Sequence, residues 1–379
     1  MIPRSGPSNP STGLADNRRL VLNVLRAAGE LTRTEIGEAS GLSPAATARI
    51  TDRLETEQLI ARTEKTPSAG GRPAWRYRFT AAGRLLGGMR VQRDGCRGAL
   101  LSWDGQILSR SEVLLDPATA TGEEILDAAR ACTRLIDHEA TSLGAQLVAL
   151  GVAVPAVTDG EGRARAGTEV GWREVPLGEE LAQLTTVPLL VENDANALAY
   201  SELTPGGHTA SLAGLILGHG LGAGLISEGH LLRGTHFAAG EIGYLITSRD
   251  VLNSPAADIG DLELRIQRAA RSRPQAADAP AQLWTLMGRS SAAAMEATAE
   301  MLDYMAMAIA SLVVVVDPER VVIGDVPPDQ ARRVLDELAT RLRGHLLHEP
   351  TITVARRGPD AVLIGAALLA GELVDLQSI

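Results

Sequence analysis

Arginine side chains that could bind a polyanion occur at two places in the first 80 residues. Arg49 and Arg53 are four residues apart in a segment with helical spacing, and Arg72 lies in the glycine-rich run 70–73. A guanidinium donates hydrogen bonds to a guanine edge or to a phosphate. An arginine on a flexible loop suits the narrow, electronegative minor groove. These residues predict contact with duplex DNA.

Three capped helical segments must position these arginines. One helix begins behind Asp16, and a second follows Thr32, with Glu35 completing a capping box. A third helix begins at Ser43, an N-cap, with Pro44 at the first helical position. Two short helices joined by a tight turn, the second capped and basic on its outer side, predict a helix-turn-helix.

The third helix and the following loop carry the predicted DNA contacts. Strands at 59–60 and 75–79 flank a loop with Gly70–Pro73 at its tip, which predicts a wing. The expected contacts are Ser43, Ala45, Ala48, Arg49 and Arg53 on the helix, and Gly71 and Arg72 on the wing. The two alanine side chains cannot hydrogen-bond to base edges, so the operator sequence cannot be predicted from these residues. The alternative is a small helical domain that packs against protein and exposes these arginines to solvent.

The charge distribution divides the chain into two unequal parts. Residues 1–80 contain 12 Lys and Arg against 8 Asp and Glu, whereas residues 81–379 contain 24 against 38. A small basic unit joined to a large acidic one is typical of a DNA-binding domain on a sensor or an enzyme. The chain starts without an apolar core for a signal peptide and contains two cysteines. These features predict a cytoplasmic protein with reduced thiols and no membrane segment.

The pattern after residue 84 alternates between strands and helices and predicts an α/β domain. We expect a disordered arm over 1–16, a winged helix-turn-helix over 17–80 and the α/β domain over 84–379. Strands are predicted at 98–102, 147–154, 189–191, 213–217, 223–227 and 321–323. Helices are predicted at 122–143, 177–184, 291–312 and 328–346. The helix predicted at 291–312 is rich in Ala and Met. We expect it to pack between the lobes, and a dimer interface is the second interpretation.

Seven runs in the α/β part resemble the ROK family of bacterial sugar kinases and transcriptional repressors. They are 151–155 (GVAVP), 171–172 (GW), 191–196 (VENDAN), 218–224 (GHGLGAG), 233–244 (RGTHFAAGEIGY), 317–324 (DPERVVIG) and 364–367 (IGAA). The winged helix in front, with GGRPA at 70–74, is also similar to that of ROK repressors. The resemblance implies a two-lobed, actin-like ATPase fold behind the winged helix-turn-helix.

The phosphate turn of the kinases in this family is altered. The family has Asp-x-Gly-Gly-Thr after the first strand of the domain, and the corresponding stretch here is 88–94. Arg90 stands in place of the aspartate on the metal side, and Gln92 and Arg93 replace glycines. Arginine has no acceptor for Mg²⁺. We therefore predict a domain without kinase activity, cofactor or catalytic residues.

The resemblance also implies a sugar pocket. It makes Asp194 the counterpart of the catalytic base, with Asn193 beside it, and retains Glu241. A carboxylate and an amide together suit neighbouring hydroxyls. Alternatively, Asn193 and Asp194 only cap the following helix, and both roles are compatible. Glu169 stands where many relatives have an asparagine, and the notable His219 is interpreted as a solvated turn residue.

The zinc site of the family is not expected here. Tyr244 replaces a histidine that contacts both sugar and zinc, and Asp261 occupies the position of a ligand cysteine. Without thiolates or the histidine, a tetrahedral zinc site cannot be assembled. We therefore predict no metal.

These features predict a transcriptional regulator, most simply a repressor. It would bind an inverted-repeat operator in double-stranded DNA as a homodimer or dimer of dimers. Asn193, Asp194, Glu241, Tyr244 and Glu169 would hold a sugar, a sugar derivative or a sugar phosphate contacted by arginine, unless the pocket is vestigial. The alternatives are an active sugar kinase with a DNA-binding head and a ligand-independent DNA-binding scaffold.

Overall fold

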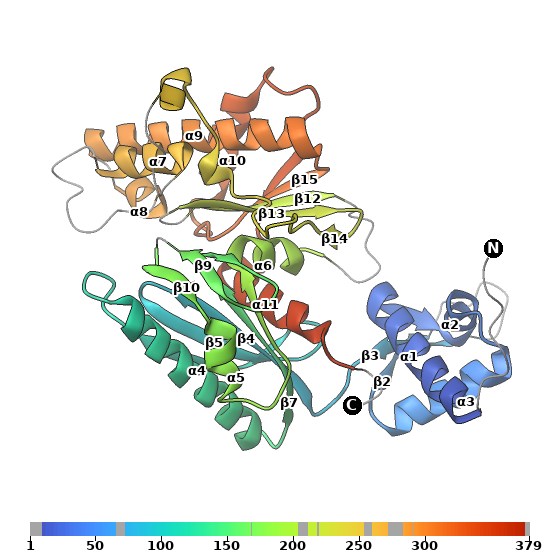
Figure 1. The fold of residues 1–379 in the computed structure, drawn as a ribbon. Coiled ribbons are helices and arrows are strands. Elements are labelled where there is room, and N and C mark those ends of the chain that lie inside the picture. Colours follow the sequence, from blue (N-terminus) through green and yellow to red (C-terminus); the bar gives the residue numbers. More distant parts are fainter. Residues whose placement is uncertain are drawn as a thin grey trace.

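A small helical domain lies beside two stacked α/β lobes in the computed structural model (Figure 1). The structure describes residues 10–65, 73–167, 169–203, 211–217, 220–253, 260–271, 283–289 and 291–375. Helices α6 and α11 lie between the sheets of the two lobes. The predicted fold class, a winged helix-turn-helix followed by a two-lobed α/β domain, is confirmed.

The small domain forms from the capped helices that the sequence predicts. The Thr32 side chain accepts a hydrogen bond from the Glu35 amide, and Glu35 returns the capping-box bond. Ser43 caps the third helix, and Gly41 ends the second with φ of 69°. The elements are α1 Pro10–Ala28, β1 Glu30–Thr32, α2 Arg33–Ser40, α3 Pro44–Thr56, β2 Ile60–Lys65 and β3 Trp75–Phe79, and the strands pair antiparallel in the order β1-β3-β2.

The boundary between the expected disordered arm and the first helix is wrong. Helix α1 begins at Pro10, so residues 10–16 are helical and Asp16 lies inside the helix instead of capping it. Proline is well tolerated at the first helical position, because its missing N–H has no helical partner there. The structure also adds β1, which the sequence interpretation did not contain.

The first lobe is a five-stranded sheet with strand order β11-β7-β4-β5-β6. Its strands β4, β7 and β11 run parallel, and β5 and β6 extend the sheet antiparallel. Helix α4 covers one side, and α11 packs on β4 and β7. The elements are β4 Arg84–Gln92, β5 Gly95–Leu101, β6 Ile107–Leu114, α4 Gly122–Ser142, β7 Gln146–Val154, β8 Val157–Thr158, β9 Ala164–Gly167, β10 Trp172–Val175, α5 Leu177–Ala182 and β11 Leu189–Asn193.

The second lobe repeats this plan with strand order β14-β13-β12-β15-β16. Its elements are α6 Asp194–Ser201, β12 Leu212–Leu217, β13 Leu221–Ser227, β14 His230–Leu231, α7 Asp261–Arg271, α8 Leu283–Met287, α9 Ala292–Val316, β15 Arg320–Ile323, α10 Ala331–Leu342 and β16 Thr351–Val354. The last helix, α11 Ala361–Gly371, returns to pack on the first-lobe sheet. Short 3₁₀ turns occur at Ile242–Tyr244, Arg249–Asn253 and Gly358–Asp360. The helix-strand order predicted for this region is thereby confirmed.

Helix α9 packs inside the second lobe and not between the lobes, contrary to the expectation. Met301, Met305 and Ile309 on its buried face belong to one apolar core with α7, α8 and α10. The helix is long and apolar enough to cross a membrane by length and composition. Packing accounts for the buried face of the helix, whereas Met295, Met307, Val314 and Val315 are exposed.

The small domain is joined to the first lobe by a continuous apolar core. Phe79 and Trp103 contact edge to face, with ring centroids 5.0 Å apart. The Arg26 guanidinium of α1 lies 5.0 Å from the centroid of the Trp103 ring, and Arg26 Nη2 donates to Glu372 Oε1 at 2.7 Å. Glu372, just after α11, also accepts a hydrogen bond from the Tyr200 hydroxyl at 3.0 Å. The small domain, α6 and α11 therefore meet at one junction.

Candidate functional site

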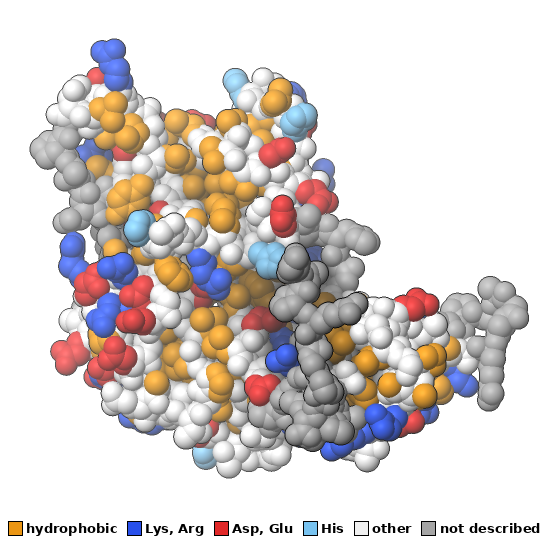
Figure 2. Space-filling view, turned by 45° about the vertical axis from the view of Figure 1, so that its right-hand side comes forward, with side chains coloured by type: hydrophobic (Ala, Val, Ile, Leu, Met, Phe, Trp, Pro, Cys, Tyr) orange, Lys and Arg blue, Asp and Glu red, His pale blue; other side chains and the backbone are white. Residues whose placement is uncertain are grey.

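The outer face of α3 exposes the residues predicted to contact DNA. Ser43, Ala45, Arg49 and Arg53 are exposed and Ala48 is half-buried, whereas Thr47, Ile50, Thr51 and Leu54 face the core. The Arg53 guanidinium binds Glu57, while the side chain of Arg49 has no polar partner among the described residues. Figure 2 shows Lys and Arg side chains along the lower edge of this domain. Arg49 is thus available to a ligand.

The predicted wing contacts Gly71 and Arg72 lie outside the described residues. The described base of the wing is cationic and aromatic. Lys65 Nζ lies 4.8 Å from the centroid of the Trp75 ring, and Arg62 lies over the same ring at 5.8 Å. The paired strands β2 and β3 therefore present positive charge beside α3.

A cavity of about 220 Å³ lies between the two lobes and gathers all five residues predicted to bind ligand. Asn193 and Asp194 come from the start of α6, Glu169 from the loop after β9, and Glu241 and Tyr244 from the segment after β14. Tyr244 is 53% exposed at the edge of the cavity. Residues up to 75 positions apart in sequence thus line one space, as the family resemblance implies. Their binding role stays a prediction.

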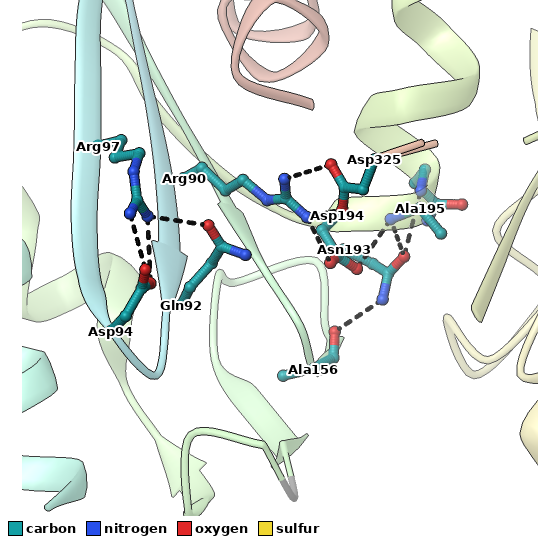
Figure 3. A network of polar contacts seen from close by, with 10 residues as sticks. Arg90, Gln92, Asp94, Arg97, Ala156, Asn193, Asp194, Ala195 and Asp325 are labelled. Atoms are coloured by element: carbon teal, nitrogen blue, oxygen red, sulfur yellow. Dashed lines mark hydrogen bonds and ion pairs between the residues drawn. The ribbon is translucent and has the colours of Figure 1, made fainter. Parts of the chain in front are cut away.

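The start of α6 uses Asn193 as its N-cap, so the alternative role weighed from the sequence is confirmed. Its Oδ1 accepts from the amides of Ala195 and Asn196 at 2.9 and 3.1 Å, and its Nδ2 donates to the Ala156 carbonyl at 3.2 Å (Figure 3). One amide hydrogen remains for a ligand. Asp194 accepts from the Ala195 amide through Oδ1 alone.

Arg90 closes the cavity from the first lobe through an ion pair with the second (Figure 3). It extends from β4, and its two terminal nitrogens donate to the two carboxylate oxygens of Asp325 at 2.8 and 2.6 Å. Asp325 follows β15 and has φ of 58°. Arg90 is 7% exposed, and its Nη2 lies 3.9 Å from Asp194 Oδ2. A bidentate pair of this kind joins the lobes at the position where the resemblance implies a phosphate turn.

The residues beside Arg90 also differ from a phosphate cradle. Residues 88–92 continue strand β4, so the expected turn is reduced to the residues that follow it. Gln92 Oε1 accepts from Arg97, and Arg93 donates to the Pro117 and Glu169 carbonyls. Arginine side chains have no acceptor atom, so Arg90 and Arg93 offer no oxygen ligand to Mg²⁺.

The loop that resembles a zinc site is closed by hydrogen bonds instead. Asp261 Oδ2 accepts from the amide and the hydroxyl of Thr247 at 2.8 and 2.6 Å, and Arg265 also binds this carboxylate. These bonds hold the pKa of Asp261 below its ordinary value despite its desolvation. Both cysteines, Cys96 and Cys132, are buried in the first lobe, so the residue set does not fit thiolate-bound zinc. His219 lies outside the described residues.

Two carboxyl groups in the cavity titrate near neutrality. Desolvation raises the pKa of Asp194 to about 7, although the charge of Arg90 opposes the increase. Desolvation, together with the charges of Asp194 and Glu263, raises the pKa of Glu241 to about 7. Burial in a low dielectric disfavours a carboxylate, and a neighbouring carboxylate does the same.

Two further carboxylates and a tryptophan line the cavity without having been assigned to it from the sequence. Glu263 of α7, Trp284 of α8 and Asp325 line it together with the predicted set. Glu263 lies two residues after Asp261, and Asp325 directly follows the family run 317–324. Their closeness to residues matched to the family could have indicated that they line the cavity. Trp284 lies in no such run, and only tertiary packing brings it to the cavity.

Glu241→Gln is expected to stabilise the protein at pH 8 and much less at pH 5. Because the folded-state pKa is raised, the contribution of Glu241 to stability falls as pH increases from about 4.5 to 7 and stays low above that range. Removing the charge should recover on the order of 1–3 kcal/mol, or several degrees in Tm, at pH 8. Thermal unfolding at both pH values measures this. Glu319→Gln at an exposed position is the control, and an equal gain at both pH values would contradict the interpretation.

Comparison with known proteins identifies both parts of the chain. The ROK family model matches residues 86–372, and the MarR family model matches residues 16–68. A xylose repressor of Bacillus subtilis is 24% identical over 251 residues, which cover 65% of this chain and 63% of the repressor. A glucokinase of Streptomyces coelicolor is 27% identical over 299 residues, covering 71% of this chain and 92% of the kinase. The match thus spans less than two thirds of that repressor.

Solved structures share the fold. A ROK family transcriptional regulator described as a homolog of the E. coli MLC protein aligns with a TM-score of 0.73 and 21% identity, over 95% of this chain and 96% of that one. A ROK glucokinase from Streptomyces griseus, in complex with glucose and AMPPNP, aligns with a TM-score of 0.61 and 23% identity, over 76% of this chain and 99% of that one. The chain therefore belongs to the ROK family and carries a winged helix-turn-helix domain ahead of its ROK domain.

Proposed function

We propose that this ROK family protein is a DNA-binding transcriptional regulator that acts as a cytoplasmic repressor. The observation that carries the proposal is Arg49, exposed and without a polar partner in the described residues, on the outer face of a capped α3 in a winged helix. The match to the MarR model, the similar xylose repressor and the shared fold of a ROK regulator support it.

The proposed target is an inverted-repeat operator in duplex DNA. A homodimer, or a dimer of dimers, presents two copies of α3 to major grooves one or two helical turns apart, about 34 Å per turn. Arg49 reaches a guanine edge or a phosphate, Ser43 and Arg53 contact the backbone, and Ala45 and Ala48 permit close approach. Gly71 and Arg72 extend the contact into the minor groove.

Arg49→Ala is expected to weaken operator binding by about 5- to 150-fold, equivalent to about 1–3 kcal/mol for a lost base or phosphate contact. Arg72→Ala should weaken binding as well, and both variants should keep the thermal stability of the parent. Fluorescence anisotropy with the promoter region of its own gene, at fixed salt, measures the affinity. Arg332→Ala is the matched control, because that arginine is 95% exposed on α10. Unchanged affinity in both test variants would refute the DNA-binding surface.

The ROK domain is proposed to bind a ligand without transferring phosphate. The buried Arg90–Asp325 pair supports this, because it places a guanidinium where phosphoryl transfer needs metal-bound phosphate. Because some relatives are kinases, kinase activity of this protein is the alternative to be tested. We expect no sugar-dependent ADP formation when the protein, Mg²⁺-ATP and a panel of hexoses and pentoses are combined in a coupled assay. Sustained turnover that a single sugar stimulates would establish the kinase alternative.

Helix α6 is proposed to transmit ligand binding to the DNA-binding domain. Its first residues line the cavity, and its Tyr200 binds Glu372, which also binds Arg26 of α1. The helix is held closely on two sides, since a Cβ atom at Gly365 of α11 or at Gly224 of β13 would collide with its backbone. A displacement at Asp194 is therefore passed to the junction instead of being absorbed. A ligand-independent scaffold would lack such coupling.

Tyr200→Phe is expected to loosen α1 without unfolding the lobes. It removes one hydrogen bond at the junction, worth about 1 kcal/mol, and should accelerate amide exchange in α1 about fivefold. Hydrogen-exchange mass spectrometry measures this segment by segment. Tyr304→Phe is the control, because Tyr304 binds Glu300 on the exposed side of α9. If α1 exchanges at the parental rate in Tyr200→Phe, α6 is not coupled to the DNA-binding domain.

A further inference from the structure

The charges that line the cleft between the lobes restrict the chemical class of its ligand. Five carboxylates line it, and Arg90 is the only cationic side chain among the described lining residues. Arg90 is already committed to Asp325 through both terminal nitrogens. The remaining carboxylates belong to Glu169, Asp194, Glu241 and Glu263, and they face a common space.

Two of these carboxylates have capacity left for a ligand. Glu241 makes no side-chain hydrogen bond or ion pair with any described residue. Asp194 is nine-tenths buried, and its Oδ2 receives no hydrogen bond, the Arg90 Nη2 atom being 3.9 Å away. A buried carboxylate without a donor is costly unless a proton or a cationic partner neutralises it. The raised pKa values of both groups agree with this unmet demand.

An independent feature of the cavity points to a ligand with hydroxyl groups. Trp284 is 5% exposed and lines the cavity, so its ring offers an apolar wall to a ligand. Asn193 keeps one amide hydrogen free. A hydroxyl oxygen would satisfy this donor, while hydroxyl hydrogens would satisfy carboxylate oxygens. The cavity of about 220 Å³ is smaller than the roughly 300–1,000 Å³ of sites for drug-sized molecules, which suits a ligand of monosaccharide size.

We propose that the cleft selects a polyhydroxylated amine, an amino sugar with a protonated nitrogen, over neutral sugars, sugar acids and sugar phosphates. An ammonium group donates to Glu241 and Asp194, and a sugar hydroxyl accepts from the Asn193 amide. A phosphate or carboxylate group on the ligand would be repelled by the four remaining carboxylates, and Arg90 is already neutralised by Asp325. The sugar phosphate considered from the sequence is therefore disfavoured. This inference rests on the proposed ligand-binding role of the cleft.

Isothermal titration calorimetry of the full chain at pH 7 tests the proposal with matched probes. These are glucosamine, galactosamine and mannosamine, the imino sugar 1-deoxynojirimycin, and glucose, N-acetylglucosamine, glucuronate and glucose 6-phosphate. At least one amine should bind about tenfold or more tightly than glucose and than N-acetylglucosamine, which differs from glucosamine by an uncharged amide. The anionic probes should bind least.

Glu241→Gln should weaken binding of the preferred amine about tenfold or more and reduce its advantage over glucose, whereas Glu319→Gln should leave both affinities unchanged. If glucose or an anionic sugar binds as tightly as every amine, or if no amine binds, the proposed ligand class is wrong. Operator binding measured separately without ligand keeps this outcome distinct, because a failure there refutes the DNA-binding function and leaves the ligand test intact.

Discussion

The ion pair between Arg90 and Asp325 is the interaction on which the arrangement of the two lobes depends. A buried guanidinium carries a desolvation cost of several kcal/mol, and a bidentate carboxylate offsets it only with good geometry. That geometry requires β4 of one lobe and the residue after β15 of the other to meet across the cleft. The pair therefore ties the lobes together at the wall of the cavity between them.

Helix α6 relates the cleft to the rest of the molecule. It is short and almost wholly buried, with the cavity at its N-terminus and the junction with the small domain near its C-terminus. Close backbone contacts with α11 and β13 leave it little freedom to adjust locally. Packed interiors transmit displacement because they are dense. A domain of this design can serve as a sensor, because its cavity and its junction with the small domain lie at the two ends of one buried helix.

The distribution of charge separates two recognition tasks. The basic small domain exposes arginine at α3 and at the base of its wing, whereas the charged residues that line the cleft are five carboxylates and one arginine. Duplex DNA is attracted to the first surface and repelled by the second. The same acidity that keeps DNA away from the lobes favours a ligand of opposite charge in the cleft. Net charge alone, −10 for the whole chain, conceals both properties.

The sequence by itself determined the features that depend on near neighbours. Caps at Thr32 and Ser43, the stop at Gly41 and the longer strands and helices of the lobes follow from local backbone preferences, and family motifs placed Asn193, Asp194 and Glu241 in one site. The sequence rules for helix starts placed the start of α1 at Asp16, whereas the helix begins at Pro10, a residue that is also favoured at the first helical position. Only the tertiary structure decided that Arg90 pairs with Asp325, 235 positions away, and that Trp284 reaches the cavity. Such pairings depend on how whole lobes pack, and no short-range pattern encodes that packing.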